Sequence, residues 1–481
     1  MPPQVAACFE RARLASDAGD HALALEALAA GAVADIQQHQ QAALGGAPGL
    51  VHVADIAERV LGAALASERA SWRASRNAAG PVIVVVPSIV QGQAISQNAV
   101  RLAAALLADG RRVHVLIAEE QTARTPPLAF LRFPDVPSSR EGAPVLQRLV
   151  EMSRESAGAL TLAMLATKGS YLDSAREAIA HARSLDARVC LLFGNVSCPV
   201  TLALAWARVA DLQIALSMGV PLIVENIDAA VFNNPRKLAR DGPVLAAWAH
   251  ARGRELRCAS VETSGGDASA AGVMASVPRR SLDVPDNAIV LVQASNALAK
   301  RLSAGTFALD LARFMATRGR ESVWWIGVGP FDASSREGAR VLAAFDAAGP
   351  GALARCRFLG PRDDVRAIVR AGDVFLNEYP EGGGNSVIEA MGCAVPVVAM
   401  RAGERHAECI GADLVGPDAI PGSDVVAYWT LAARWCEDAP ARHAAGGRQR
   451  ERAVLHLDSG AIMRSYVSIL RSLEASGGPP H

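Results

Sequence analysis

The 481-residue sequence has no net charge, very little lysine and no apolar run long enough to cross a membrane. Its 48 basic and 48 acidic residues balance, so it lacks the positive field that attracts nucleic acid or acidic membranes. Its only lysines are Lys168, Lys237 and Lys300, and each is therefore a candidate for a specific task. The most apolar stretch, 81–90, is shorter than the roughly 20 residues that span a bilayer. An integral membrane segment is not expected.

Cysteine pairs at metal-binding spacing are also missing. The eight cysteines are scattered and none belongs to a C-x-x-C pair, so no metal site is expected. Reduced, mostly buried thiols of a cytoplasmic protein are the simpler interpretation. The first residues carry charges where a secretory signal needs an apolar core, which favours the same location.

Residues 1–75 are rich in alanine at helical spacing and show no strand pattern. The stretch 15–32 resembles part of a tetratricopeptide helical hairpin, although such units need stacked neighbours to bury their faces. Two interpretations stay open: a docking arm for a protein partner, and a plain helical cap, which the single partial repeat favours.

From Pro81 onward, strands alternate with helices. Continuous apolar runs predict parallel strands that are buried on both faces, at 81–86, 113–118, 187–193 and 221–226. A segment rich in glycine, serine and alanine at 258–285 predicts a linker. A second alternation follows, with strands expected at 288–294, 322–328, 356–359, 373–378 and 395–400.

The chain is therefore expected to be an α/β protein of five parts. They are a helical extension (1–75), an N-terminal Rossmann-like domain (76–257), a linker (258–285), a C-terminal Rossmann-like domain (286–455) and a C-terminal helix and tail (456–481). Two doubly wound domains of this kind are expected to face a cleft and to bind ligands beyond the carboxyl ends of their strands.

The most informative segment is DVFLNEYPEGGGNSVIEAMGCAVPVV, residues 373–398. A buried strand leads into a glycine turn (Gly382, Gly383 and Gly384) and then into a helix. Glycine lets the backbone approach a ligand closely, and the free N–H groups of a helix start suit a diphosphate. Two acids flank the turn. Glu389 suits the hydroxyls of a ribose, and Glu381 could face the sugar.

A purely structural interpretation of the same residues is open. Ser386 and Glu389 fit the S-x-x-E capping box, in which the glutamate only caps its own helix. Glycines are also common in loops before helices. The residues alone therefore leave the capping and the ligand interpretations evenly balanced.

The segment resembles the donor-binding motif of glycosyltransferase family 4, which has the GT-B fold. Glu381 and Glu389 are spaced as E-x7-E, and the run EAMGCAVPVV follows the family pattern. The turn also resembles that of the O-GlcNAc transferase family, with Asn385, Ser386 and Glu389 at its two hydroxyl positions and its acid. The resemblance implies that the C-terminal domain binds a nucleotide-sugar donor, and a UDP-sugar is the first donor expected.

Further positions match these families in chain order. Asn296 and Lys300 resemble an Asn-x-x-x-Lys pair whose lysine contacts the donor diphosphate. Family 4 carries an arginine before that lysine; here Arg301 or Asn296 must substitute, or the contact is missing. Three glycines resemble turns that face the donor: Gly327 and Gly329 after the second C-terminal strand, and Gly92 in the N-terminal domain. The alternative for Lys300 is a solvated surface lysine.

The resemblance implies a transfer that needs no metal cofactor, and the sequence has no D-x-D pair to chelate one. Charge on the departing diphosphate would be met by Lys300, Arg405 and the helix dipole. His406 could also face the donor, although a surface role is the alternative. Stereochemistry is open, because family 4 retains and the O-GlcNAc transferase family inverts. An inverting enzyme needs a base, for which Glu225 and Asp228 are candidates; Asp228 could equally be a helix cap.

The expected function is transfer of a sugar from a nucleotide sugar to a hydroxyl of a protein, a glycan or a small molecule. Two alternatives stay open. One is a non-hydrolysing nucleotide-sugar epimerase, which shares the double Rossmann fold and needs no acceptor. The other is a degenerate transferase that serves as a binding subunit, which the altered glycine loop around Gly92 motivates.

Overall fold

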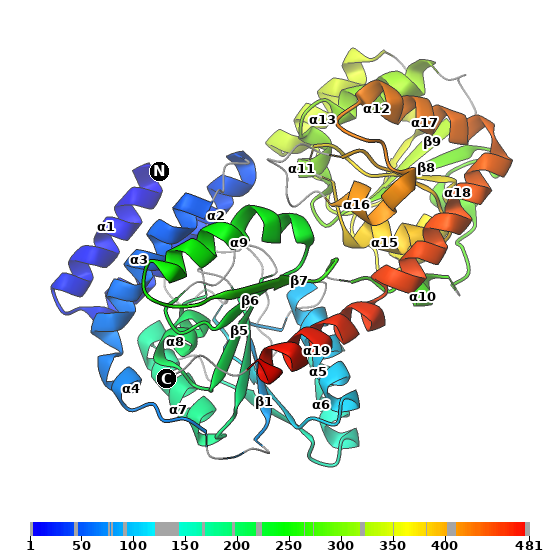
Figure 1. The fold of residues 1–481 in the computed structure, drawn as a ribbon. Coiled ribbons are helices and arrows are strands. Elements are labelled where there is room, and N and C mark those ends of the chain that lie inside the picture. The colour runs from blue at the N-terminus through cyan, green and yellow to red at the C-terminus, as the bar shows by residue number, and fades with distance from the viewer. Residues whose placement is uncertain are drawn as a thin grey trace. The chain divides into compact units, whose positions relative to one another are not determined.

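The computed structural model describes residues 3–42, 47–75, 77, 80–89, 94–120, 144–165, 169–194, 198–217, 224–263, 265–272, 274–317, 323–349, 351–380, 382–401 and 410–476. The chain divides into two compact units (Figure 1). The first contains Met1–Ser264 and Met463–His481, and the second contains Gly265–Ile462. Both are α/β units with parallel sheets, as the alternating pattern predicted.

The first unit is built on a seven-stranded sheet in the order β3-β2-β1-β4-β5-β6-β7. Its strands are β1 (Val82–Val86), β2 (Val113–Ile117), β3 (Leu160–Met164), β4 (Val189–Phe193), β5 (Leu212–Ser217), β6 (Ala229–Phe232) and β7 (Arg257–Ser260). Three of the four strands expected here are confirmed, as β1, β2 and β4. Their sequences are apolar except for His114 of β2, which agrees with burial on both faces.

The strand expected at 221–226 is wrong over its described part, because Val224–Asn226 form a turn. The apolar run reflects burial rather than strand geometry: Val224 and Ile227 fill the core from a connection. The real strands, β5 and β6, lie on either side of it. Short apolar runs do not by themselves distinguish a strand from another buried segment.

Helices cover both faces of this sheet (Figure 1). One face carries α5 (Ala94–Ala108), α6 (Pro144–Glu155) and the end of α19 (Ser459–Ala475). The other carries α7 (Tyr171–Ser184), α8 (Pro199–Ala207) and α9 (Pro235–His250). Within the described part of the chain, none of the helices combines the length and apolar character that a bilayer crossing needs.

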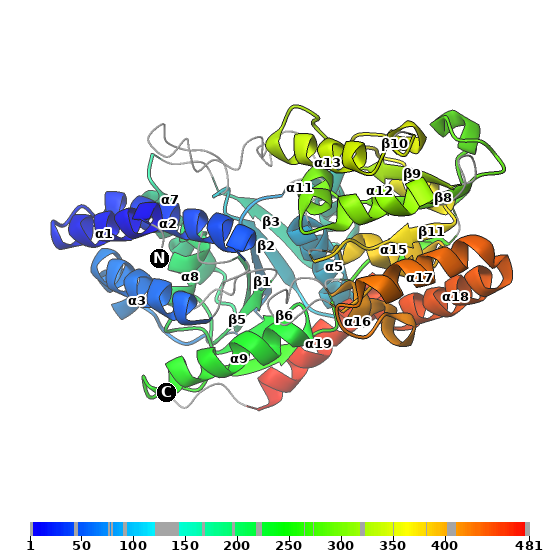
Figure 2. The ribbon, with the colours of Figure 1, turned by 90° about the horizontal axis from the view of Figure 1, so that it is seen from above.

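The N-terminal residues form α1 (Pro3–Asp17), α2 (His21–Ala42), α3 (Ala47–Ala64) and the short α4 (Ala66–Ala70). Helices α1 and α2 form a hairpin whose turn holds Gly19 at φ 78°, and Asp20 accepts a hydrogen bond from the N–H of Leu23. Figures 1 and 2 show α1–α3 outside α7 and α8. All of these helices share one apolar core with the sheet, so the helical extension packs as part of the first unit.

The amphipathic C-terminal helix packs on the same unit. Tyr466, Leu470 and Leu473 of α19 lie against apolar residues of α5, β4, β5 and β6. Its last turn is joined to the end of α5 by Arg111 and Glu474, whose two pairs of nitrogen and oxygen atoms are each 2.7 Å apart. The end of the chain is therefore fixed to the first unit by both apolar and ionic contacts.

The second unit has a five-stranded sheet in the order β10-β9-β8-β11-β12. The strands are β8 (Ile289–Ala294), β9 (Val323–Val328), β10 (Cys356–Phe358), β11 (Val374–Leu376) and β12 (Val397–Val398). All five were expected from the sequence, with boundaries within a few residues. The segment 258–285, expected as a linker, holds the end of β7, then α10 (Ala268–Ala271) and a 3-10 turn (Arg279–Leu282). The division between the units falls within this segment.

Two apolar clusters flank the second sheet. One face carries α10, α14 (Val365–Arg370), α15 (Asn385–Gly392) and α16 (Gly411–Val415). The other carries α11 (Leu298–Ser303), α12 (Phe307–Thr317), α13 (Arg336–Ala347) and α17 (Val425–Glu437). Helix α18 (Ala439–Arg452) contacts α15 and α17 and leads through a π-helical turn, Ala453–Leu457, into α19.

Candidate functional site

In the second sheet, β8 has β9 on one side and β11 on the other. The chain first winds outward from β8 through β9 to β10, then returns to the opposite side of β8 with β11 and β12. Ligands of open α/β sheets bind beyond the carboxyl ends of the strands at this reversal. The segments after β8 and β11 are therefore where a ligand of this unit is expected.

The glycine turn follows β11 and is held against the end of that strand. The side-chain amide of Asn377 donates a hydrogen bond to the carbonyl of Gly383 at 3.1 Å. The carbonyl of Asn377 in turn accepts a hydrogen bond from the hydroxyl of Tyr428 at 3.1 Å. A Cβ atom on Gly382 would collide with the Asn377 side chain and with the carbonyl of Glu378. The turn therefore requires glycine at this position.

Helix α15 begins directly after the turn without a side-chain cap. Its N-cap position is Gly384, which has no side chain to accept from the first N–H groups. These N–H groups form the positive end of the helix dipole, the feature that makes helix starts suitable for anions. Ser386 lies inside the first turn rather than at the cap, so the capping-box interpretation of Ser386 and Glu389 does not describe this helix.

Among the residues that the structure describes, Arg301 of α11 brings a positive charge to the turn. Its Nη1 lies 3.6 Å from Oε1 of Glu378, and a Cβ atom on Gly383 would collide with the same guanidinium nitrogen. Lys300 and Asn296, the residues singled out from the sequence, are both exposed. The structure thus brings the neighbour of Lys300 to the turn, and a phosphate contact by Lys300 or Asn296 stays a prediction.

Glu389 lies on α15, one turn beyond the helix start, and interacts with a second arginine. Its Oε1 is 3.2 Å from Nη2 of Arg366, which belongs to α14. The same nitrogen donates to Asp267 at 2.5 Å. Burial lowers the pKa of Arg366, but the two carboxylates raise it more. Glu389 is therefore paired with Arg366 and keeps a partly exposed side chain, and its contact with a ribose stays a prediction.

The two glycines expected near the donor lie at the end of β9 and also have structural reasons. A Cβ atom on Gly327 would collide with the indole of Trp325, and one on Gly329 would collide with the carbonyl of Ser295. Gly329 has φ 137°, a conformation that favours glycine. Both positions are explained by packing, and their contact with a ligand stays a prediction.

Glu225 and Asp228, the candidate bases, lie at the amino-terminal edge of the first sheet, just before β6. They do not follow a strand as the sequence suggested, because the segment 224–228 is not a strand and β6 begins only at Ala229. Ligands of such sheets bind at the carboxyl edge, so this position does not favour a catalytic role. Both residues line a cavity of about 310 Å³ at the amino-terminal edge.

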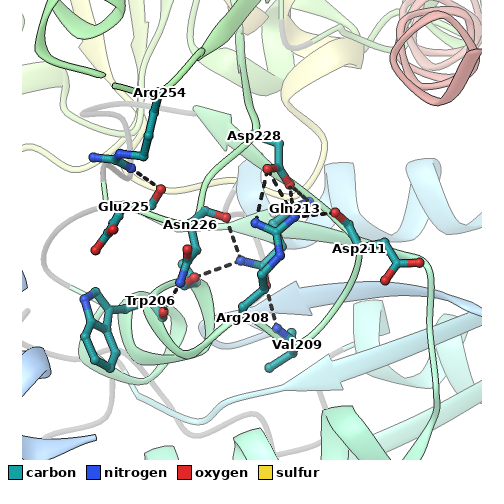
Figure 3. Close-up of polar contacts among 10 residues, drawn as sticks. Trp206, Arg208, Val209, Asp211, Gln213, Glu225, Asn226, Asp228 and Arg254 are labelled. Carbon is teal, nitrogen blue, oxygen red and sulfur yellow. Dashed lines mark hydrogen bonds and ion pairs between the residues drawn. The ribbon is translucent and has the colours of Figure 1, made fainter. Parts of the chain in front are cut away.

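Figure 3 shows what Asp228 does there. Its carboxylate pairs with Arg208, with Nη1 and Oδ1 3.2 Å apart, and accepts from the N–H of Gln213 at 2.7 Å. Arg208 has φ 62°, a backbone conformation that residues other than glycine rarely adopt. The ion pair with Asp228 helps to hold this conformation. Burial raises the pKa of Asp228, and Arg208 opposes that rise. The pair joins two connections of the sheet.

Glu225 is also committed to structural contacts. Its Oε2 is 2.6 Å from Nη1 of Arg69, from α4, and this hydrogen bond lowers the pKa of Glu225. Its carbonyl accepts a hydrogen bond from Arg254, a contact that Figure 3 also shows. Glu225 therefore joins the N-terminal helices to the edge of the first sheet.

Four expected site residues, Glu381, Arg405, His406 and Gly92, lie outside the described residues, and their roles stay predictions. Sequence reasoning overlooked two residues of this region: Glu378, beside the glycine turn, and Arg366, which pairs with Glu389. An acid inside the apolar run DVFLNE was the available signal for Glu378. For Arg366 nothing in the local pattern was unusual. Among the described residues, no group of three or more histidine, cysteine or acidic side chains is arranged to hold a metal ion.

Comparisons with known proteins agree with the resemblance seen in the sequence. Residues 309–427, within the second unit, match the family of glycosyl transferases group 1. A comparison of the sequence with curated proteins gives no match. The partial family match and the shared fold described next support an enzyme of the glycosyltransferase class.

Among solved structures, a glycosyltransferase of Rickettsia africae is 11% identical with a TM-score of 0.60, covering 82% of this chain and 99% of that one. Anabaena HepE (Alr3699) in complex with UDP-glucose is 16% identical with a TM-score of 0.54, covering 82% of this chain and 100% of that one. An O-GlcNAc transferase mutant of Thermobaculum terrenum is 13% identical with a TM-score of 0.55, covering 98% of this chain and 97% of that one. These likenesses confirm the GT-B fold.

Proposed function

We propose that this protein transfers a sugar from a nucleotide-sugar donor to an acceptor hydroxyl, and that the second unit binds the donor at the carboxyl ends of β8 and β11. One observation carries this proposal: an uncapped helix start follows a glycine turn against which Arg301 lies. A diphosphate fits a site with a bare helix N-terminus and a guanidinium on one side. HepE, which shares the fold, is known in complex with UDP-glucose, so UDP-linked sugars are the first donors to test.

In the proposed reaction, the acceptor oxygen forms a bond to the anomeric carbon, and the bond between that carbon and the diphosphate breaks. The hydroxyl proton passes to solvent, and negative charge grows on the leaving diphosphate. The guanidinium of Arg301 and the N–H groups at the start of α15 would stabilise that charge, because they are already oriented before the reaction starts. We also propose that no divalent ion is required, since these groups supply the positive charge that a chelated ion would supply. Glu389 would accept from the ribose hydroxyls, and Lys300 stays a second candidate for the diphosphate.

For the acceptor we propose a protein hydroxyl first, and a glycan or a small molecule after it. The likeness to the O-GlcNAc transferase covers 98% of this chain and therefore includes the N-terminal helices. The helical hairpin of α1 and α2 supports a role in contacting a protein acceptor, by analogy of fold alone. The general base stays open, since Glu225 and Asp228 lie at the amino-terminal edge of their sheet.

The test is a donor-cleavage screen over UDP-, GDP-, ADP-, TDP- and CMP-sugars, with and without EDTA. The parent protein is expected to cleave one class of donor, and EDTA should leave the rate unchanged. Arg301→Met should lower kcat/KM by about 100-fold, the scale for loss of one oriented charge partner. Glu474→Gln, which changes an arginine-paired glutamate of the first unit, is the matched control and should retain the parent rate.

Each other result has a definite meaning. If no donor is cleaved or bound, the proposed function is wrong. Conversion of the donor to its epimer without any acceptor would identify the epimerase alternative. If Arg301→Met cleaves donor at the parent rate while Lys300→Met does not, the phosphate contact belongs to Lys300.

A further inference from the structure

Two polar side chains are fully buried beneath the glycine turn without satisfied hydrogen bonds. Glu378 follows β11, and no part of its side chain is exposed; Gln293, at the end of β8, is equally buried. Among the described residues, neither carboxyl oxygen of Glu378 and neither amide atom of Gln293 meets a hydrogen-bond partner in good geometry. Buried polar groups are nearly always hydrogen-bonded in folded proteins, so this cluster needs a physical explanation.

Several neighbouring elements contribute polar groups around Glu378. Arg301 approaches from α11 at 3.6 Å, and Gln293 lies beside the carboxyl from β8. The glycine turn presents the N–H of Gly383, and α17 brings Tyr428 within electrostatic range. Arg301 is the one cation among these described neighbours. Burial raises the pKa of Glu378, and Arg301 opposes that rise most.

Arg301 is well placed to connect this buried acid to a ligand. Its side chain is 24% exposed, whereas that of Glu378 is fully buried, so Arg301 contacts the acid and also reaches the protein surface. A guanidinium has five N–H donors, and an ion pair through Nη1 leaves others for a second anion. However, the negative charge of an ionised Glu378 offsets the positive charge of Arg301, and this weakens the attraction between Arg301 and a diphosphate.

We propose that Glu378 is a positioning residue, which holds Arg301 against the glycine turn and takes up a proton when the donor diphosphate binds. The proposal rests on the proposed function, because the diphosphate of a nucleotide sugar is taken as the ligand. The proton comes from the solvent and adds to one carboxyl oxygen, and no other bond forms or breaks. Protonation removes the negative charge behind Arg301, so that its full positive charge faces the phosphates.

The binding of UDP-glucose as a function of pH tests this coupling. UDP-glucose is the right probe because each of its phosphates has a single, strongly acidic ionisable oxygen that does not titrate near neutral pH, whereas the terminal phosphate of UDP does titrate there. If the donor screen selects another base, the GDP- or ADP-linked sugar takes its place. Calorimetry in two buffers of different ionisation enthalpy should show up to one proton taken up per donor bound. The dissociation constant should rise with pH by up to about tenfold per pH unit.

Glu378→Gln separates this role from a purely structural one. Glutamine keeps the size of the side chain and can still accept from Arg301, but it cannot titrate. Binding by Glu378→Gln should therefore lose its pH dependence and its proton uptake, and above the titration range it should be at least as tight as in the parent. Glu378→Ala should lose the anchor for Arg301 and raise the KM for donor about tenfold, with thermal unfolding recorded to verify folding. Glu474→Gln should keep the parent's pH dependence.

The possible failures are distinguishable. If the parent binds no nucleotide sugar, the proposed function fails and this inference fails with it. If the parent binds UDP-glucose with no proton uptake, the function stands and the coupling is wrong. If Glu378→Gln is folded but weakens binding equally at every pH and keeps the parent's slope, another group takes up the proton and Glu378 is only structural.

Discussion

Oε1 of Glu389 lies 3.2 Å from Nη2 of Arg366, which joins α15 to α14 one turn beyond the glycine turn. This contact fixes one carboxylate oxygen in the protein and leaves Glu389 in a single orientation. A carboxylate held in this way is preorganised to accept hydrogen bonds from a ligand, because less side-chain freedom is lost on binding.

The first prediction concerns selectivity for ribose. If Glu389 accepts from the ribose hydroxyls, the parent should bind UDP about 10- to 100-fold more tightly than 2′-deoxy-UDP, the range for a hydrogen bond to a charged group. Glu389→Ala should bind both nucleotides with equal, weaker affinity. Isothermal titration of the two ligands into the two proteins measures this.

The control for that experiment is Glu474→Gln, which should keep the selectivity of the parent. Undiminished preference for UDP in Glu389→Ala would assign the ribose contact to another residue. Glu389 would then serve only to hold α14 and α15 together through Arg366.

How much of this site the sequence could predict depends on the kind of pattern involved. The glycine turn and the start of α15 were predictable, because three consecutive glycines before an apolar helical pattern have few structural meanings. Which of Lys300 and Arg301 lies at the glycine turn was not predictable. Successive residues of a helix point about 100° apart, so the exact orientation of α11 decides which cation meets the turn. That orientation is set by packing of Leu298 and Leu302 in the core.

The strands of the first sheet also show where prediction from the sequence ends. Strands β1, β2 and β4 were predictable because they are apolar runs, interrupted only by His114 in β2, that are buried on both faces. The run 221–226 begins with four apolar residues, yet its described part is a turn that contributes Val224 to the core. A sequence records that such residues are buried, whereas tertiary contacts decide their backbone conformation. The position of Glu225 and Asp228 was misjudged for this reason.

The second prediction is a loss of stability in mild acid through His114. This side chain of β2 is buried, with Nδ1 2.8 Å from the hydroxyl of Thr161 and Nε2 3.0 Å from Nε2 of His181. Burial and the neighbouring His181 lower the pKa of His114 to about 4. An unfolded histidine titrates near pH 6.5, so the unfolded state binds the proton first. The contribution of His114 is therefore complete above about pH 6.5 and is lost as the pH falls toward 4.

Urea unfolding between pH 7.5 and 4.5, followed by a probe in the first unit, measures this effect. Over that range the free energy of unfolding should fall, with His114 accounting for about 2–3 kcal/mol at most. In His114→Asn, which retains a partner for Thr161, the free energy of unfolding should fall less steeply with decreasing pH. In His250→Asn, at an exposed position, it should follow that of the parent. Equal slopes for His114→Asn and the parent would show that other groups carry the acid sensitivity.

The third prediction concerns the fixation of the C-terminal helix. Arg111 and Glu474 form a two-point ion pair in which the side chains are only 20% and 32% exposed, and Arg111 also contacts Asp109 at 2.9 Å. Pairs of this geometry are stronger than ordinary surface pairs. A double-mutant cycle of Arg111→Met and Glu474→Gln should give a coupling free energy of about 0.5–1.5 kcal/mol. Chemical unfolding of the four proteins measures it, and a coupling of zero would mean that apolar packing alone holds α19.

The last prediction separates structure from catalysis at Asp228. Removing one member of a buried ion pair leaves the other uncompensated, which costs about 3–5 kcal/mol. Asp228→Asn should therefore be markedly less stable than the parent. The double variant Asp228→Asn with Arg208→Met should recover part of that loss, because no buried charge is then left alone. Unfolding by urea distinguishes the three proteins.

Activity of the same variants decides whether Asp228 is a base. Loss of a general base lowers kcat by roughly 10²- to 10⁴-fold, whereas loss of a structural pair at the opposite edge of the sheet should leave the folded enzyme within about threefold of the parent. Because Asp228 precedes β6 and accepts from Gln213 and Arg208, we expect the second result when kcat is measured on folded protein at low temperature. A fall of 100-fold or more in Asp228→Asn, with normal unfolding behaviour, would instead place the chemistry at this edge. The cavity of about 310 Å³ beside Asp228 would then be the acceptor site.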